Sequence, residues 1–179
     1  MKLEAEHLMK IMVLLKRDRA ELFLPFLNET CDKFEINTAR RQAAFLAQIA
    51  HESWGLHYTK EIASGIAYEG RKDLGNIEPG DGKKFKGRGL IQITGRFNYE
   101  NCGEALGLDL IEHPELLAEP REACLSAGWF WKSHDLNRLA DDQDFLGITK
   151  RINGGTTGYA KRLVYFKIAN EVLKAGAYE

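Results

Sequence analysis

Two glutamates, Glu52 and Glu61, have the residue type and spacing for acid–base chemistry. On one continuous helix of about 100° per residue their carboxyl groups would lie on opposite sides. Gly55 lies between them and is well placed to end a helix, so we expect Glu61 to return across a cleft on another segment. Two carboxyl groups that face each other over a gap are what glycoside hydrolysis requires: one donates a proton, and the other activates water or attacks the sugar.

The segment before Glu52 predicts a buried helix. Thr38 can cap it, and residues 39–50 are apolar around most of the circumference. Glu52 would then lie in the last turn, where the helix dipole and apolar neighbours such as Trp54 both disfavour the charged form of a carboxyl group. A carboxyl group that stays protonated near neutral pH can act as a general acid. A glutamate at a helix end is, by itself, usually solvated and without a catalytic role.

Glu69 is a second candidate for the base. It lies in the sequence Tyr68-Glu69-Gly70-Arg71, where Arg71 or Arg88 could keep its carboxylate ionised. Pairing with an arginine is also the ordinary structural explanation for such a glutamate. The residues alone therefore leave the choice between Glu61 and Glu69 open.

Residues 90–94 alternate between branched aliphatic and polar side chains. This pattern predicts a short strand that directs Ile91 and Ile93 into the core and Gln92 and Thr94 toward the opposite face. Gln92 could hydrogen-bond a sugar hydroxyl or acetamido group, and Thr94 could orient a water molecule. The alternative is a half-exposed edge strand whose polar residues have no role. The glycines of this region precede the strand, whereas those of a dinucleotide site follow a strand and open a helix.

The remaining periodicity predicts mainly helices. We expect an amphipathic N-terminal helix that ends near Pro25, and further helices over residues 120–132, 141–152 and 158–175. The aromatic residues 129–131 are more typical of a core than of a sugar-stacking surface. Between residues 69 and 88 the chain is rich in glycine, which indicates a long loop that forms a lid or a wall of a binding site.

Composition and charge limit the class of protein. With 179 residues and 44% hydrophobic composition, the chain can form one domain with a substantial core. A net charge of -1, without a basic stripe, argues against a nucleic-acid partner. The apolar run at residues 11–15 is too short to span a membrane, and no signal peptide is visible, so we expect no stable membrane insertion.

The cysteines and histidines argue against a cofactor. Cys31, Cys102 and Cys124 are odd in number and lack the spacing of metal ligands, which predicts reduced, buried thiols and suits synthesis in the cytoplasm. The spacing of His51 and His57 differs from that of a helical zinc motif and turns the two rings to different faces. We therefore expect no metal and no other cofactor.

Three ordered blocks carry a resemblance to a known family. Residues 50–53 (AHES), 86–99 (KGRGLIQITGRFNY) and 152–155 (INGG) resemble the signature blocks of family 19 glycoside hydrolases. The likeness is greatest to the lysozyme-like endolysins of bacteriophages, with the chitinases of the family further off. It implies a mainly α, lysozyme-like α+β fold, in which a two-lobed helical domain has a small β-sheet beside the cleft. We expect a single catalytic domain, 1–179, in which an N-terminal helical segment, 1–36, packs on a catalytic core, 38–169.

The resemblance also implies roles for individual residues. Glu52 would be the general acid and Glu61 the general base of an inverting, single-displacement hydrolysis, and Thr94 would help to hold the water. The chitinases of the family place the base much further from the acid, so Glu61 follows the endolysin pattern and Glu69 stays open. The candidates for binding substrate or supporting the site are His51, Tyr68, Glu69, Gln92, Asn98, Asn153 and Arg162.

The function that we expect from these features is that of a peptidoglycan-degrading endolysin. It would hydrolyse the β-1,4 bonds between N-acetylmuramic acid and N-acetylglucosamine during lysis of the host cell. We expect a monomer, made in the host cytoplasm, that reaches the periplasm with the help of a separate pore-forming protein. The alternatives are a chitinase, a non-catalytic glycan-binding protein on the same scaffold, and a lytic transglycosylase, which needs only one catalytic acid.

Overall fold

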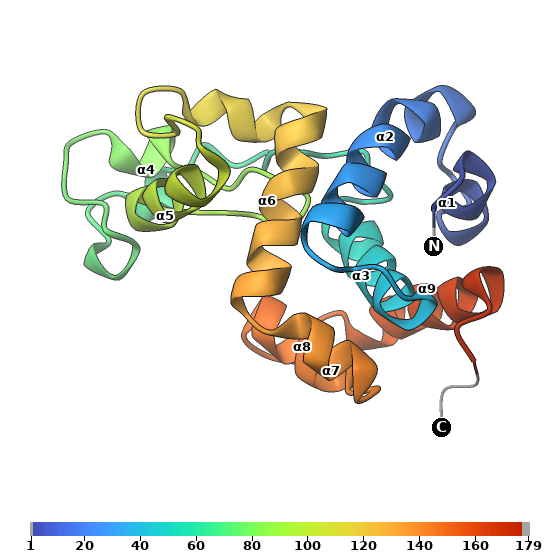
Figure 1. Ribbon diagram of the computed structural model, residues 1–179. Helices are drawn as coiled ribbons and strands as arrows, with labels where there is room; N and C mark the ends of the chain where they lie inside the picture. The colour runs from blue at the N-terminus through green and yellow to red at the C-terminus, as the bar shows by residue number, and fades with distance from the viewer. Residues whose placement is uncertain (1, 177–179) are drawn as a thin grey trace.

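The computed structural model describes residues 2–176, and helices joined by loops make up most of this chain (Figure 1). The helices are α1 (Ala5–Ile11), α2 (Arg17–Lys33), α3 (Ala39–Glu52), α4 (Asp81–Lys84), α5 (Arg96–Leu106), α6 (Pro120–Ser133), α7 (Leu136–Asp141), α8 (Phe145–Asn153) and α9 (Tyr159–Leu173). Three 3-10 turns connect them: η1 (Ile66–Tyr68), η2 (Lys72–Leu74) and η3 (Pro114–Ala118).

The expected capped and buried helix is α3. The hydroxyl oxygen of Thr38 accepts a hydrogen bond from the backbone N–H of Arg41 at 3.2 Å, which satisfies one of the free amides at the start of the helix. Residues 42–50 are all buried, and α3 packs against α1, α7 and most extensively α9. Glu52 is the last residue of this helix, so its side chain lies at the end of the buried helix, at the edge of the core.

Two separate hydrophobic clusters form two lobes. The larger includes α1, α2, α3 and α6–α9, and residues of the N-terminal segment such as Leu8 and Phe23 belong to it. The smaller consists of Phe85, Ile93, Tyr99, Cys102, Leu110 and Leu117. Helix α6 runs between the two groups of helices, and its Trp129 and Phe130 pack against both clusters (Figure 1). The expected mainly helical, two-lobed class is therefore confirmed.

The expected small sheet is not formed by the described residues. Only two isolated antiparallel bridges occur there, Lys60 with Arg88 and Arg88 with Ile93. The backbone groups of Arg88 and Ile93 bond each other at 2.8 and 3.1 Å across residues 89–92, which closes a tight loop and ends the pairing. The predicted burial of the alternating residues still agrees with the structure: Ile91 and Ile93 are buried, Gln92 is exposed and Thr94 is half-buried.

Two helix boundaries also differ from the expectation. The single N-terminal helix expected to end near Pro25 is two helices, α1 and α2, and Pro25 lies inside α2. Pro25 is tolerated there because it is exposed, so the carbonyl group that loses its partner can remain hydrated. The helix expected from residue 141 begins at Phe145, where the Asp144 carboxylate accepts from the backbone N–H of Gly147 at 2.8 Å. The predictions for 120–132 and 158–175 match α6 and α9 to within two residues.

The cysteines and Trp131 behave as core residues. Cys31, Cys102 and Cys124 are buried and unpaired, and burial raises the pKa of Cys31 and Cys102 to about 12. The Trp131 ring packs edge-on against Phe45 with centroids 5.2 Å apart. Within residues 2–176, no helix has the length and apolar character that crossing a membrane requires.

Candidate active site

Glu52 is held by an ion pair with a buried arginine. The Arg162 guanidinium, on α9, lies 2.5 Å from Oε1 of Glu52, and the side chains are 2% and 22% exposed respectively. Trp54, which the sequence suggested as an apolar neighbour of Glu52, is 78% exposed. The carboxyl group therefore has a fixed position and stays partly accessible to a substrate.

The arginine is in turn fixed by buried polar groups that the sequence analysis did not single out. Arg162 Nη1 donates to Oε1 of Gln48 at 2.6 Å, and Gln48 Nε2 donates to the hydroxyl of Thr149 at 2.9 Å. The Thr149 hydroxyl donates to the carbonyl of Phe145 at 3.0 Å. This network joins α3, α9 and α8. Gln48 lies one turn before Glu52 in an otherwise apolar run, which is a sequence signal for a buried polar role.

His51 lies beside the same arginine. A Cβ atom added to Gly158 would lie 2.7 Å from two atoms of the His51 ring, so only glycine allows the start of α9 to approach this closely. Burial lowers the pKa of His51 below its usual value, and the positive charge of Arg162 lowers it further. His51 is therefore placed to support the site as a neutral imidazole.

Glu61 is held from the small lobe. Its Oε1 accepts from the backbone N–H of Gly87 at 2.6 Å, and its Oε2 accepts from the phenol of Tyr68 at 3.0 Å. The backbone N–H of Glu61 also donates to the carbonyl of Gly87 at 2.9 Å. Burial and the bond to Glu61 raise the pKa of Tyr68, so the phenol remains a hydrogen-bond donor. Glu61 is thus a half-buried carboxylate with a defined orientation.

Gln92 and Thr94 lie next to the Glu61 contact. A Cβ atom added to Gly87 would lie 2.7 Å from Oε1 of Gln92 and 3.3 Å from the hydroxyl of Thr94. The loop at 87–94 therefore brings the amide, the hydroxyl and the Glu61 carboxylate close to Gly87. Asn98 is one turn into α5 and donates from Nδ2 to the carbonyl of Thr94 at 2.8 Å, which ties it to the same loop.

Glu69 has different partners. Its two carboxylate oxygens accept from the backbone N–H groups of Gly80 and Gly82 at 2.7 and 2.8 Å. The expected arginine partners bind elsewhere: Arg71 pairs with Asp73, while Arg88 donates to the carbonyl of Lys84 and the phenol of Tyr99. Glu69 therefore stabilises the glycine-rich loop by binding two of its backbone amides, and these bonds use both of its carboxylate oxygens.

Asn153 stands apart from the other candidates. It is the last residue of α8 and is exposed, and Gly154 follows it in a left-handed conformation. No hydrogen bond in the described part of the chain joins Asn153 to Glu52 or Glu61. The structure thus assembles two groups of candidates, one around Glu52 and Arg162 in the large lobe and one around Glu61 and Gly87 in the small lobe.

Most of the chain matches a known family of proteins. The sequence model of the family described as chitinase class I, glycoside hydrolase family 19, matches residues 23–148, more than half of the chain. The chain belongs to glycoside hydrolase family 19. Its helical, lysozyme-like fold is the fold of that chitinase-like family.

Individual family 19 proteins resemble the chain over most of its length. An endochitinase of Arabidopsis thaliana is 41% identical over 130 residues, which cover 71% of this chain but 44% of the endochitinase. A family 19 domain-containing protein of Haemophilus influenzae is 32% identical over 158 residues, and the match covers 77% of that protein. The structure of chitinase C of Streptomyces griseus superposes on this chain with a TM-score of 0.80 at 22% identity. The superposition covers 98% of this chain and 78% of the chitinase C chain. The chain therefore spans less than half the length of the Arabidopsis endochitinase.

Proposed function

We propose that this family 19 hydrolase cleaves β-1,4 bonds between N-acetylated sugars by an inverting mechanism in which Glu52 is the acid and Glu61 the base. The observation that carries this proposal is the separate support of the two carboxyl groups. Arg162 orients Glu52 from the large lobe, while Gly87 and Tyr68 orient Glu61 from the small lobe. A substrate that lies between the lobes would meet one carboxyl group on each side.

The reaction follows from these positions. In its protonated form, Glu52 donates a proton to the glycosidic oxygen as the bond to the anomeric carbon breaks, and Glu61 takes a proton from the attacking water. The Thr94 hydroxyl, which lies close to Gly87, would orient that water. The partial positive charge that develops on the sugar is stabilised by the Glu61 carboxylate. The product carries the opposite anomeric configuration from the substrate.

We infer that the natural polymer is bacterial peptidoglycan and that the protein acts as an endolysin during host-cell lysis. The signature blocks at 50–53, 86–99 and 152–155 resemble those of bacteriophage endolysins. The three buried, unpaired thiols support synthesis in a reducing cytoplasm, because proteins built for the extracellular space commonly use disulfides. Release to the cell wall would then depend on a separate pore-forming protein.

Chitin is the second candidate polymer. The endochitinase of Arabidopsis and chitinase C of Streptomyces are named for this substrate. Both polymers present N-acetylated sugars in β-1,4 linkage, and the side chains of Gln92 and Asn98 suit either.

One experiment separates these functions. Purified protein is incubated with Gram-negative cells whose outer membrane has been permeabilised and, separately, with chitin oligosaccharides, and the products are analysed by mass spectrometry. Clearing of the cells with new N-acetylmuramic acid reducing ends supports the endolysin. Turnover of chitin alone contradicts it, anhydro sugars would identify a lytic transglycosylase, and binding without cleavage would identify a glycan-binding protein.

A further inference from the structure

A groove of about 900 Å³ lies beside the Glu52 site, and the reaction described above does not use it. Its walls come from the turn between α1 and α2 (residues 12–16), the turn after α3 (residues 54–58) and one side of α9 (residues 161–168). Binding pockets for small ligands have volumes of about 300–1,000 Å³. The groove is therefore large enough to hold a ligand of several residues.

The walls of the groove expose apolar side chains to solvent. Leu14 is 96% exposed, Val13 is 77% exposed, and Trp54 on the facing turn is 78% exposed. Trp54 also has a left-handed backbone with a φ of 54°, which a bulky residue rarely adopts. Contiguous exposed apolar side chains around a concave surface are typical of a binding site.

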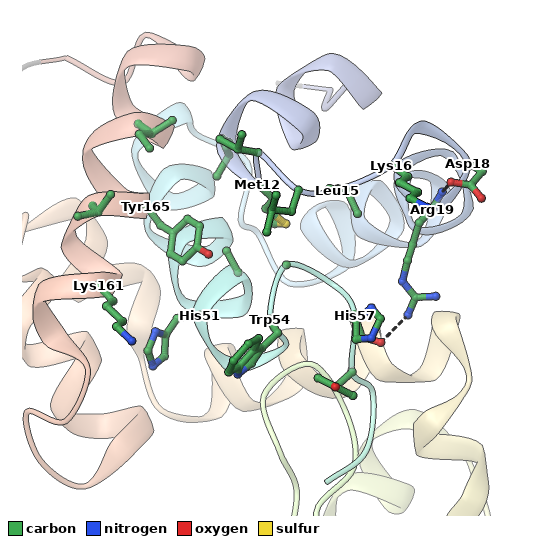
Figure 2. A pocket seen from close by; sticks show the side chains of 18 residues that line it. Met12, Leu15, Lys16, Asp18, Arg19, His51, Trp54, His57, Lys161 and Tyr165 are labelled. Atoms are coloured by element: carbon green, nitrogen blue, oxygen red, sulfur yellow. Dashed lines mark hydrogen bonds between the residues drawn. The ribbon is translucent and has the colours of Figure 1, made fainter. Parts of the chain in front are cut away.

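The ends of the groove are positively charged. Figure 2 shows Lys161 beside His51 at one end and Arg19 at the other. Lys16 adds a third cation, while the one acidic side chain in the lining is Asp18. Arg19 is fixed by hydrogen bonds to the carbonyls of Leu56 and His57, but no carboxylate in residues 2–176 pairs with Lys16 or Lys161. The groove therefore suits an anionic ligand with small apolar groups.

The groove reaches the residue that precedes the proposed acid in the chain. His51 lines the groove and directly precedes Glu52, and Gly158 places the start of α9 against the His51 ring. In peptidoglycan, a peptide stem branches from the lactyl group of N-acetylmuramic acid, one of the two sugars that the scissile bond joins. The stem must therefore leave the cleft within one sugar ring of the carboxyl group that protonates this bond.

We propose that this groove binds the peptide stem of N-acetylmuramic acid, an inference that rests on the proposed peptidoglycan substrate. The stem consists of small residues such as alanine and carries several free carboxylates. The alanine methyl groups would pack on Leu14 and Trp54, and the carboxylates would lie near Lys16 and Lys161. The groove then acts as a specificity site that favours sugars with a stem over bare glycan.

The test uses two soluble substrates that differ only in the stem. One is a glycan strand of alternating N-acetylglucosamine and N-acetylmuramic acid with tetrapeptide stems, and the other is the same strand after an amidase has removed them. Wild-type protein is expected to show a kcat/KM about tenfold higher for the strand with stems, the effect of one or two charge-assisted contacts. This ratio should fall as ionic strength rises, because partly exposed charges are screened.

Substitutions in the groove test whether the preference for the strand with stems arises there. Lys161→Glu and Leu14→Asp each place a negative charge in the groove at an exposed position, so the fold is retained and the ratio of kcat/KM should approach one. Lys167→Glu on α9 and Ile77→Asp in the small lobe are matched controls outside the lining and should keep the wild-type ratio.

The outcomes distinguish this inference from the proposed function. Equal cleavage of both strands by wild-type protein, or a ratio that Lys161→Glu leaves unchanged, overturns the stem-binding groove while peptidoglycan hydrolysis stands. Cleavage of chitin and of neither strand overturns both. Titration of the free tetrapeptide, followed through the NMR shifts of the Trp54 indole, measures binding independently of cleavage. Indole shifts in wild-type protein that Lys161→Glu abolishes support the groove. Absence of indole shifts in wild-type protein contradicts it.

Discussion

At the scale of single residues, the two catalytic candidates are held by different means. Glu52 depends on the charge of one buried arginine, whereas Glu61 depends on hydrogen bonds from one amide and one phenol. The sequence predicted both glutamates from their type and spacing. The family resemblance named Arg162 and Tyr68 as site residues, but the sequence could not assign them to Glu52 and Glu61, because these groups approach only when distant segments pack together.

The choice of base is testable with paired substitutions. Glu61→Gln removes the group that accepts the proton of the water, so kcat should fall by about 10²–10⁴-fold with the fold intact. Glu69→Gln breaks one of the two bonds to the Gly80 and Gly82 amides, so we expect a free energy of unfolding lower by about 1–2 kcal/mol and a much smaller loss of kcat. Kinetics and thermal melts of both variants check this. A greater loss of kcat in Glu69→Gln would make Glu69 the base.

Glu52→Gln should lower both activity and stability. From the sequence alone, stability would be expected to change little. The ion pair alters this expectation, because the glutamine leaves the buried Arg162 without its counter-charge. Hydrolysis should fall by about 10²–10⁴-fold, and the free energy of unfolding by about 1–3 kcal/mol. Glu104→Gln, at an exposed position on α5, is the control for both measurements, and an unchanged hydrolysis rate in Glu52→Gln would exclude Glu52 as the acid.

His51 should make stability depend on pH. Its pKa is lowered in the folded state, first by burial and then by Arg162, so below about pH 6.5 the unfolded chain binds more protons than the folded one. The contribution of the neutral ring to stability is complete above pH 6.5 and is lost as pH falls toward the folded-state pKa. Melting temperatures from pH 8 to 5 should fall less steeply in His51→Gln than in wild type. His57→Gln, at an exposed position, should follow the wild-type curve; identical curves for all three proteins would contradict this account.

At the scale of elements, α3 was the most predictable part of the fold. Its cap and its apolar run are local signals, so both its bounds and its burial follow from the sequence. The strand expected at 90–94 was wrong, because bonds between Arg88 and Ile93 close a loop that alternation alone cannot distinguish from a strand. The contacts among α3, α8 and α9 through Gln48 and Thr149 depend on tertiary packing and had no sequence prediction.

Two buried threonines test the importance of this network. Thr149→Val removes the acceptor for Gln48, so the free energy of unfolding should fall by about 1–3 kcal/mol, and kcat should fall more than KM rises because Arg162 loses its support. The buried Thr30 hydroxyl has no hydrogen-bond partner within residues 2–176, so Thr30→Val, the same chemical change, should leave stability equal or higher. Urea unfolding measures both, and equal destabilisation would show that the network contributes little.

At the scale of the whole molecule, two hydrophobic clusters lie on either side of helix α6 (Figure 1). The larger cluster holds α3 and α9, which carry Glu52 and Arg162, whereas the loop that binds Glu61 contributes Leu90 and Ile91 to the larger cluster and Ile93 to the smaller. The sequence indicated two lobes through the family resemblance, and its glycine-rich stretch at 69–88 predicted a long loop. It could not supply the path of that loop, which depends on side-chain contacts such as those of Glu69 and of Asp81 with Arg96.

The stereochemistry of the first product tests the central claim, that Glu52 and Glu61 act together in a single displacement. Hydrolysis of a β-1,4-linked oligosaccharide of N-acetylated sugars is followed by proton NMR from the first seconds, before the new reducing end equilibrates. An inverting site leaves room for water, with carboxyl groups about 6.5–9.5 Å apart, so the account predicts that the α-anomer is formed first. Initial formation of the β-anomer would contradict it, because retention requires a covalent or substrate-assisted intermediate in place of a water activated by Glu61.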